Sequence, residues 1–83
     1  MIGTYSLFNE EYSISKIEAG YILTNTATAE KKAFINVTSN NSLLFNSDTI
    51  NGTLVINDDG DLEVEYFNNA SGKVEKATLY RVE

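Results

Sequence analysis

The sequence predicts an all-β fold, in which a single antiparallel meander of seven or eight short strands forms a small or partly open barrel. Apolar and polar residues alternate over short stretches, which is the period of a half-buried strand. Gly and Asn recur roughly every ten residues between these stretches, as turns do in a meander. The 83 residues are 42% hydrophobic, with five Tyr and four Phe, which suffices for one core. We therefore expect one acidic β domain over residues 1–83.

The first part of the chain contains five candidate strands. They cover residues 4–8, 11–17, 21–26, 33–38 and 42–46. In the second of them Tyr12, Ile14 and Lys16 alternate with two serines. Glu18-Ala19-Gly20 is expected to turn the chain into the third, and Ser39-Asn40-Asn41 to separate the fourth from the fifth.

The stretch INGTLVINDDGDLEVEYFNN, residues 50–69, gives the clearest β pattern. Its two apolar runs flank Asp58-Asp59-Gly60, a turn in which the glycine can supply a positive φ. Leu62, Val64 and Tyr66 are predicted to share one face of the following strand, and Glu63, Glu65 and Phe67 the other.

Two details of this second half stay open. Asn51-Gly52 fits either a two-residue hairpin turn or a kink within one strand, and we favour the kink. The last strand, residues 74–82, has apolar side chains on both faces, so its inward face is undetermined.

Two segments compete for a short helix, over residues 10–19 or 26–33. Asn9 before Glu10 and Glu11, with Gly20 beyond, resembles an N-cap, an acidic first turn and a C-terminal glycine. The alternation from Tyr12 to Lys16 favours a strand instead. The segment 26–33 has good helix formers but is long enough for only one or two turns.

The composition argues against catalysis. The chain has no His and no Cys, and so lacks the usual proton carrier and nucleophile of a neutral-pH active site. Glu63 and Glu65 share a strand face, but paired carboxylates need a cleft, which so small a domain rarely has. We expect no catalytic residue, no cofactor and no enzymatic activity.

The acidic loop does not fit a calcium site. If Gly60 took the sixth position of an EF-hand, Val55 and Tyr66 would occupy the first and last ligand positions, where neither can serve. Asp and Asn are also the residues that turns prefer. We therefore expect no metal site.

Gly3-Thr4-Tyr5 at the start and Arg81 in the last strand resemble the pattern of small lipocalin-like (calycin-type) barrels. In that family a G-x-W motif near the start packs against an arginine of the last strand across the closed end. Tyr5 stands here for the tryptophan, and the chain is about half the usual length. The resemblance implies that Tyr5 and Arg81 form a structural end-cap, with a stacked cation and ring.

The charge is unevenly distributed, with a net value of −6. Residues 33–72 hold six carboxylates and no basic residue, while the rest of the chain is balanced. The six carboxylates belong to Asp48, Asp58, Asp59, Asp61, Glu63 and Glu65. Such a field repels nucleic acid and anionic membranes and attracts a basic surface. We expect neither direct nucleic-acid binding nor membrane binding.

Our first hypothesis is a non-enzymatic protein-binding module that docks these carboxylates on a basic surface of a larger, nucleic-acid-binding partner. Small phage-encoded anti-defence inhibitors act in this way, an analogy of size and charge. The hypothesis predicts affinity that falls with salt and with change of the carboxylates to amides.

The alternative hypothesis is a lipocalin-like barrel that binds an apolar small molecule. The side chains expected to line its pocket are Tyr21, Leu23, Phe34, Phe45, Leu62, Val64 and Tyr66. A cavity would favour this alternative. A third hypothesis is a homodimer through an open sheet edge, since no proline guards any strand. The lack of cysteine, of a signal segment and of a long apolar run leads us to expect a cytoplasmic protein.

Overall fold

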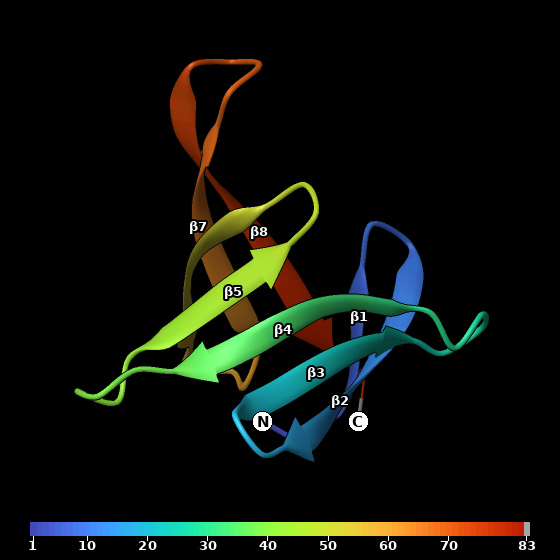
Figure 1. Cartoon of the computed structure of the whole chain (residues 1–83). Helices are drawn as coiled ribbons and strands as arrows, with labels where there is room; N and C mark the ends of the chain where they lie inside the picture. Colours follow the sequence, from blue (N-terminus) through green and yellow to red (C-terminus); the bar gives the residue numbers. More distant parts are fainter. Residues whose placement is uncertain (83) are drawn as a thin grey trace.

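The computed structural model describes residues 1–82, which form eight antiparallel strands closed into one barrel (Figure 1). The strands are β1 (Gly3–Leu7), β2 (Glu10–Ile17), β3 (Gly20–Asn25), β4 (Lys31–Val37), β5 (Leu43–Ser47), β6 (Asn51–Ile56), β7 (Leu62–Asn68) and β8 (Lys73–Arg81). Each strand pairs with the next, and β8 returns to β1. The predicted all-β meander is therefore confirmed, and the barrel is closed rather than partly open.

Side chains alternate between the barrel interior and its outer surface. On β7 the side chains of Leu62 and Val64 are buried, while Glu65 is exposed and Glu63 half-buried. The β8 ambiguity is resolved in the same way, because Leu79 is buried. The buried apolar side chains form one cluster of Tyr5, Tyr12, Ile14, Leu23, Ala33, Ile35, Phe45, Leu54, Leu62, Val64 and Leu79. Burying each large aliphatic side chain stabilises the fold by about 1.5 to 3 kcal/mol.

The helix proposed over residues 10–19 is wrong, because residues 10–17 form β2. Tyr12 and Ile14 both point into the core, two residues apart, and only a strand can bury them together on one face. The glycine that resembled a helix C-terminus is the first residue of β3, and it lies opposite Asn36 of β4. Tertiary burial of alternate side chains outweighs the local capping signals.

The helix proposed over residues 26–33 is also wrong. The Asn25 side-chain oxygen accepts hydrogen bonds from the backbone N–H groups of Ala27 (2.9 Å) and Thr28 (3.2 Å), which begins a single turn. Ala29 then adopts a left-handed backbone with φ of 62°, which a helix cannot contain. The turn ends there, and β4 begins at Lys31.

Gly52 lies inside β6, so the alternative of a hairpin turn at Asn51-Gly52 is wrong. The turn comes earlier, where the Ser47 hydroxyl accepts a hydrogen bond from Ile50 N–H at 2.9 Å. A Cβ on Gly52 would overlap the backbone carbonyl oxygen of Glu65 on β7. The glycine allows β6 and β7 to approach closely at this point.

The antiparallel order gives the barrel two different ends. The capped end carries the turns 18–19, 38–42 and 57–61 and both ends of the described chain, which lie near each other in Figure 1. The open end carries the turns 8–9, 26–30, 48–50 and 69–72. Closure pairs β1 with β8, so the described residues contain no free edge strand of the kind that the homodimer hypothesis required.

Candidate functional site

Tyr5 and Arg81 meet at the capped end of the barrel. Their backbones lie opposite each other where β1 pairs with β8. Arg81 Nη1 donates a hydrogen bond to the Tyr5 hydroxyl at 2.9 Å, and the hydroxyl donates to the Met1 carbonyl oxygen at 3.0 Å. The Arg81 Cζ atom lies 5.5 Å from the centre of the Tyr5 ring. This contact holds the first and last strands together at that end.

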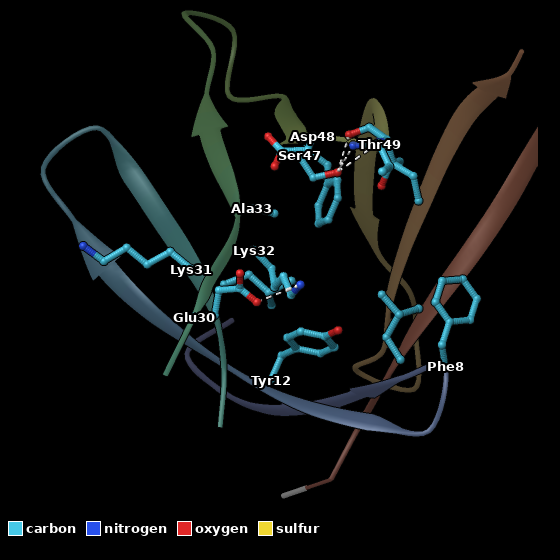
Figure 2. Close-up of a pocket in the computed structure, with 13 residues that line it drawn as sticks. Phe8, Tyr12, Glu30, Lys31, Lys32, Ala33, Ser47, Asp48 and Thr49 are labelled. Carbon is cyan, nitrogen blue, oxygen red and sulfur yellow. Dashed lines mark hydrogen bonds and ion pairs between the residues drawn. The ribbon is translucent and has the colours of Figure 1, made fainter. Parts of the chain in front are cut away.

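The opposite end contains a cup-shaped cavity of about 290 Å³ (Figure 2). Four buried side chains from four strands form its floor: Tyr12 of β2, Leu23 of β3, Ala33 of β4 and Phe45 of β5. The rim comes from the turns of the open end and the residues next to them: Leu7, Phe8, Glu30, Lys31, Lys32, Ser47, Asp48, Thr49 and Ile50. A cavity of this size, apolar below and polar above, is at the small end of the range for ligand pockets.

The Tyr12 hydroxyl points into this cavity (Figure 2). Only 7% of the residue is exposed, so the ring packs in the floor. In the described part of the chain, every fully buried side-chain oxygen or nitrogen has a hydrogen-bond partner. The Tyr12 hydroxyl makes no hydrogen bond within this part of the chain and is therefore not fully buried; it keeps contact with solvent on the cavity side.

An ion pair lies at the rim above Tyr12. Lys32 Nζ is 3.0 Å from Glu30 Oε1, and both side chains are substantially exposed. The hydrogen bond and the charge of Glu30 raise the pKa of Lys32 above its ordinary value. The Lys32 ammonium therefore stays protonated through neutral pH.

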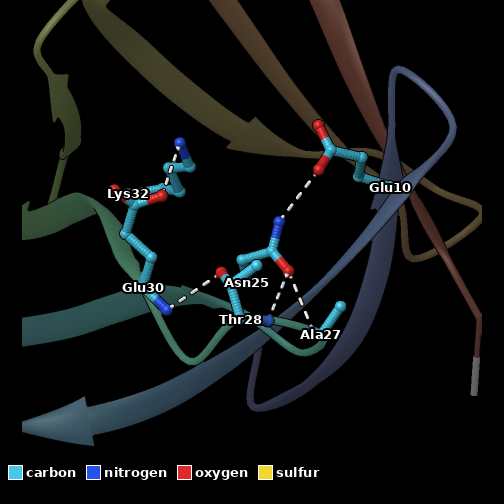
Figure 3. A network of polar contacts seen from close by, with 6 residues as sticks. All are labelled: Glu10, Asn25, Ala27, Thr28, Glu30 and Lys32. Carbon is cyan, nitrogen blue, oxygen red and sulfur yellow. Dashed lines mark hydrogen bonds and ion pairs between the residues drawn. The ribbon is translucent and has the colours of Figure 1, made fainter.

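Asn25 fixes the turn that carries this ion pair (Figure 3). Its side chain is almost fully buried and donates a hydrogen bond from Nδ2 to Glu10 Oε1 at 3.0 Å. Its backbone N–H donates to the Glu30 carbonyl oxygen at 2.8 Å. The position of Glu30, and with it that of Lys32, is thus tied to β2 and β3.

Five of the six carboxylates singled out from the sequence lie at the capped end and along β7. Asp58 and Asp59 are exposed in the turn 57–61, and Glu63 and Glu65 follow on the outer face of the strand. Asp61 is half-buried, and its Oδ1 accepts a hydrogen bond from the Arg81 backbone N–H at 2.8 Å. We call the four remaining residues, Asp58, Asp59, Glu63 and Glu65, the acidic flank.

Asp48 does not belong to this group. It is in the turn 48–50 at the open end, at the other end of β6 from the turn 57–61. There it lines the rim of the cavity. Asn57 organises the acidic turn instead: its Oδ1 accepts from Asp59 N–H and its Nδ2 donates to Glu63 Oε2, at 3.0 and 3.2 Å.

The pocket expected from the sequence differs from the cavity in the structure. Of the expected lining residues only Leu23 and Phe45 contribute to it. Leu62 and Val64 are deep in the core, and Phe34 faces outward with 46% of its surface exposed. Sequence reasoning missed Tyr12, Glu30 and Lys32. The alternation placed Tyr12 on an inward face, but nothing local indicated the end of the barrel at which it lies.

No protein family, curated protein or solved structure matches this chain. Within residues 1–82, no three side chains of His, Cys, Asp or Glu gather as metal ligands would. That same part of the chain contains no helix with the length and hydropathy needed to cross a bilayer.

Proposed function

We propose that this protein is a non-enzymatic binding protein that holds a small, largely apolar molecule at the open end of its barrel. The observation that carries the proposal is the cavity of about 290 Å³ with a buried apolar floor. Eight strands enclose just enough space for side chains to fill or for one small ligand. The cavity lies at one end of the barrel, whereas Leu62 and Leu79, close to the other end, are fully buried.

The contact at the capped end supports the same proposal. The side-chain hydrogen bond of 2.9 Å between Tyr5 and Arg81 is the kind of contact that a lipocalin-like end-cap would make. A barrel sealed at one end and hollow at the other is the arrangement that the resemblance implies. Within this proposal, the chain is a shortened barrel of that type.

The proposal is tested by NMR titration with a neutral probe, 4-phenylbutan-1-ol. We expect saturable shifts of amide signals that are confined to Tyr12, Leu23, Ala33 and Phe45, with raised thermal stability as the probe concentration exceeds Kd. The variant Ala33→Leu fills the floor and should weaken binding. The control Ala19→Leu adds the same side chain to an exposed turn at the capped end. Absence of saturable shifts, or shifts spread over both ends, would contradict the proposal.

A second candidate function is docking of the acidic flank on a basic surface of a larger, nucleic-acid-binding partner, as phage anti-defence proteins do. What favours it is that Asp58 and Asp59 continue into Glu63 and Glu65 along one side of the barrel. Charged surfaces of this kind accelerate and orient association with an oppositely charged partner, and salt weakens the effect.

This second candidate is tested with two triple variants of equal net charge. One changes Asp58, Asp59 and Glu65 to amides, and the other changes Glu11, Glu18 and Asp48, which are also exposed but lie elsewhere. Affinity for a partner captured from host lysate should fall with salt and fall much further for the first variant. Equal losses in both would mean that only net charge matters, and salt-independent binding would exclude the candidate.

A further inference from the structure

The cavity presents hydrogen-bond donors above an otherwise apolar floor. Leu23, Ala33 and Phe45 offer only apolar surface, so the body of any ligand seated there must be apolar as well. The polar atoms that can reach such a ligand come from Tyr12 and from the rim. They therefore determine which functional group the ligand carries.

Tyr12 requires a hydrogen-bond partner from the ligand. The residue is 7% exposed, and because its hydroxyl makes no hydrogen bond within the described chain, that oxygen is one of the atoms that stay in contact with solvent. A ligand that fills the cup removes this hydroxyl from water. The loss is compensated only if the ligand accepts or donates a hydrogen bond at that point.

The Lys32 ammonium determines whether the polar group of the ligand should be a hydrogen-bond acceptor or a hydrogen-bond donor. An ammonium group has three N–H donors, and the contact with Glu30 at 3.0 Å needs only one. Two N–H donors of Lys32 remain, and the charges of Lys32 and Glu30 offset each other. The nearby Glu10 carboxylate, which also acts on Lys32, accepts a hydrogen bond from Asn25 Nδ2. Lys31 and Asp48 also line the rim, with opposite charges, and the Lys31 side chain extends away from Tyr12 in Figure 2. A cationic group would meet the Lys32 ammonium, whereas an anionic oxygen would meet donors.

We propose that the open-end cavity selects an apolar molecule that bears a carboxylate, with its oxygens accepting hydrogen bonds from the Tyr12 hydroxyl and the Lys32 ammonium. The inference rests on the proposed small-molecule function and names its ligand class. A carboxylate has two oxygens and suits two donors that project from different strands, β2 and β4. Bonds to a charged group are also about twice as strong as neutral ones.

The test compares three probes that share one apolar body: 4-phenylbutyrate, 4-phenylbutan-1-ol and 4-phenylbutylamine. Their Kd values are measured by NMR titration against the intact chain. We expect the carboxylate to bind about tenfold more tightly than the alcohol, and the amine to bind least. Tyr12→Phe and Lys32→Met should each remove most of the preference for the carboxylate over the alcohol.

Two matched variants control for nonspecific effects. Tyr80→Phe removes a hydroxyl from the outer face of β8, and Lys76→Met removes an exposed lysine charge from the same strand, away from the cavity. Both variants should keep the preference for the carboxylate over the alcohol. Equal affinity of the native protein for carboxylate and alcohol would overturn the ligand class while the small-molecule function stands. Failure of all three probes to bind would overturn the proposed function together with this inference. The comparison of probes on the native protein holds even if a variant misfolds.

Discussion

The seam between β1 and β8 has the fewest paired residues of any strand pairing in the barrel. Within residues 1–82, two residue pairs join these strands, Tyr5 with Arg81 and Ser6 with Tyr80, and Val82 N–H donates to the Thr4 carbonyl at 2.9 Å; five pairs join β1 to β2. We therefore predict that Arg81→Met destabilises the fold through this seam. Methionine retains much of the aliphatic stem but removes the guanidinium group.

The magnitude follows from the contacts that are lost. The hydrogen bond from Arg81 to the Tyr5 hydroxyl, at 2.9 Å, contributes about 0.5 to 1.5 kcal/mol. The cation placed 5.5 Å from the ring centre adds about 0.5 to 1 kcal/mol. The expected loss is about 1 to 2.5 kcal/mol, which lowers Tm by roughly 4 to 20 °C for a domain of this size.

The assay is urea unfolding followed by far-UV circular dichroism, combined with amide hydrogen exchange. Exchange should accelerate first in β1 and β8, because local opening of the seam requires less free energy than global unfolding. Lys73→Met, which removes an exposed cation from the same strand, serves as the control. The reasoning is refuted if Arg81→Met destabilises the protein no more than this control, or if protection is lost in β4 and β5 instead. Adding Tyr5→Phe completes a double-mutant cycle that isolates the pair.

Two other predictions concern the remainder of the barrel. Gly52→Ala should lower the free energy of unfolding by about 1 to 3 kcal/mol, because the added methyl group overlaps the Glu65 carbonyl and forces β6 away from β7. Urea unfolding measures this loss. An unchanged free energy of unfolding would mean that the two strands can separate at no cost. Hydrogen bonds from Asn68 and Ser71 hold the pKa of Glu75 below its ordinary value, so an NMR pH titration should give Glu75 a lower midpoint in the folded chain than in the urea-unfolded chain, and Asn68→Ala should raise the folded-chain midpoint. Since the folded-state pKa is depressed, the ionised Glu75 stabilises the β7–β8 hairpin above its unfolded-state pKa, and that contribution disappears as pH falls through the folded-state pKa.

The sequence alone predicted the strands and the side chains that share a face. Residues 62–66 alternate apolar and acidic residues, and alternation is a property of a single strand that needs no knowledge of its neighbours. The same reliance on local sequence patterns also led to the wrong helix predictions. Around Glu10 and Gly20 the residues imitate helix caps, and only burial of Tyr12 and Ile14 on one face resolves the competition.

Contacts between residues far apart in the chain depended on the tertiary structure. Tyr5 and Arg81 are separated by 76 positions, and the sequence identified them only through a family resemblance. Asp48 appeared to belong with the other carboxylates because it is near them in sequence. One strand, β6, carries it to the opposite end of the barrel.

The sequence by itself determined that this chain forms short antiparallel strands with one apolar face, because that pattern is encoded residue by residue in the backbone period. Only the tertiary structure decided that the eight strands close, which end is sealed and which is hollow, and that Tyr12 and Lys32 share one cavity. The physical reason is that closure depends on the register summed over all eight strand pairs. No single segment of the sequence contains that sum.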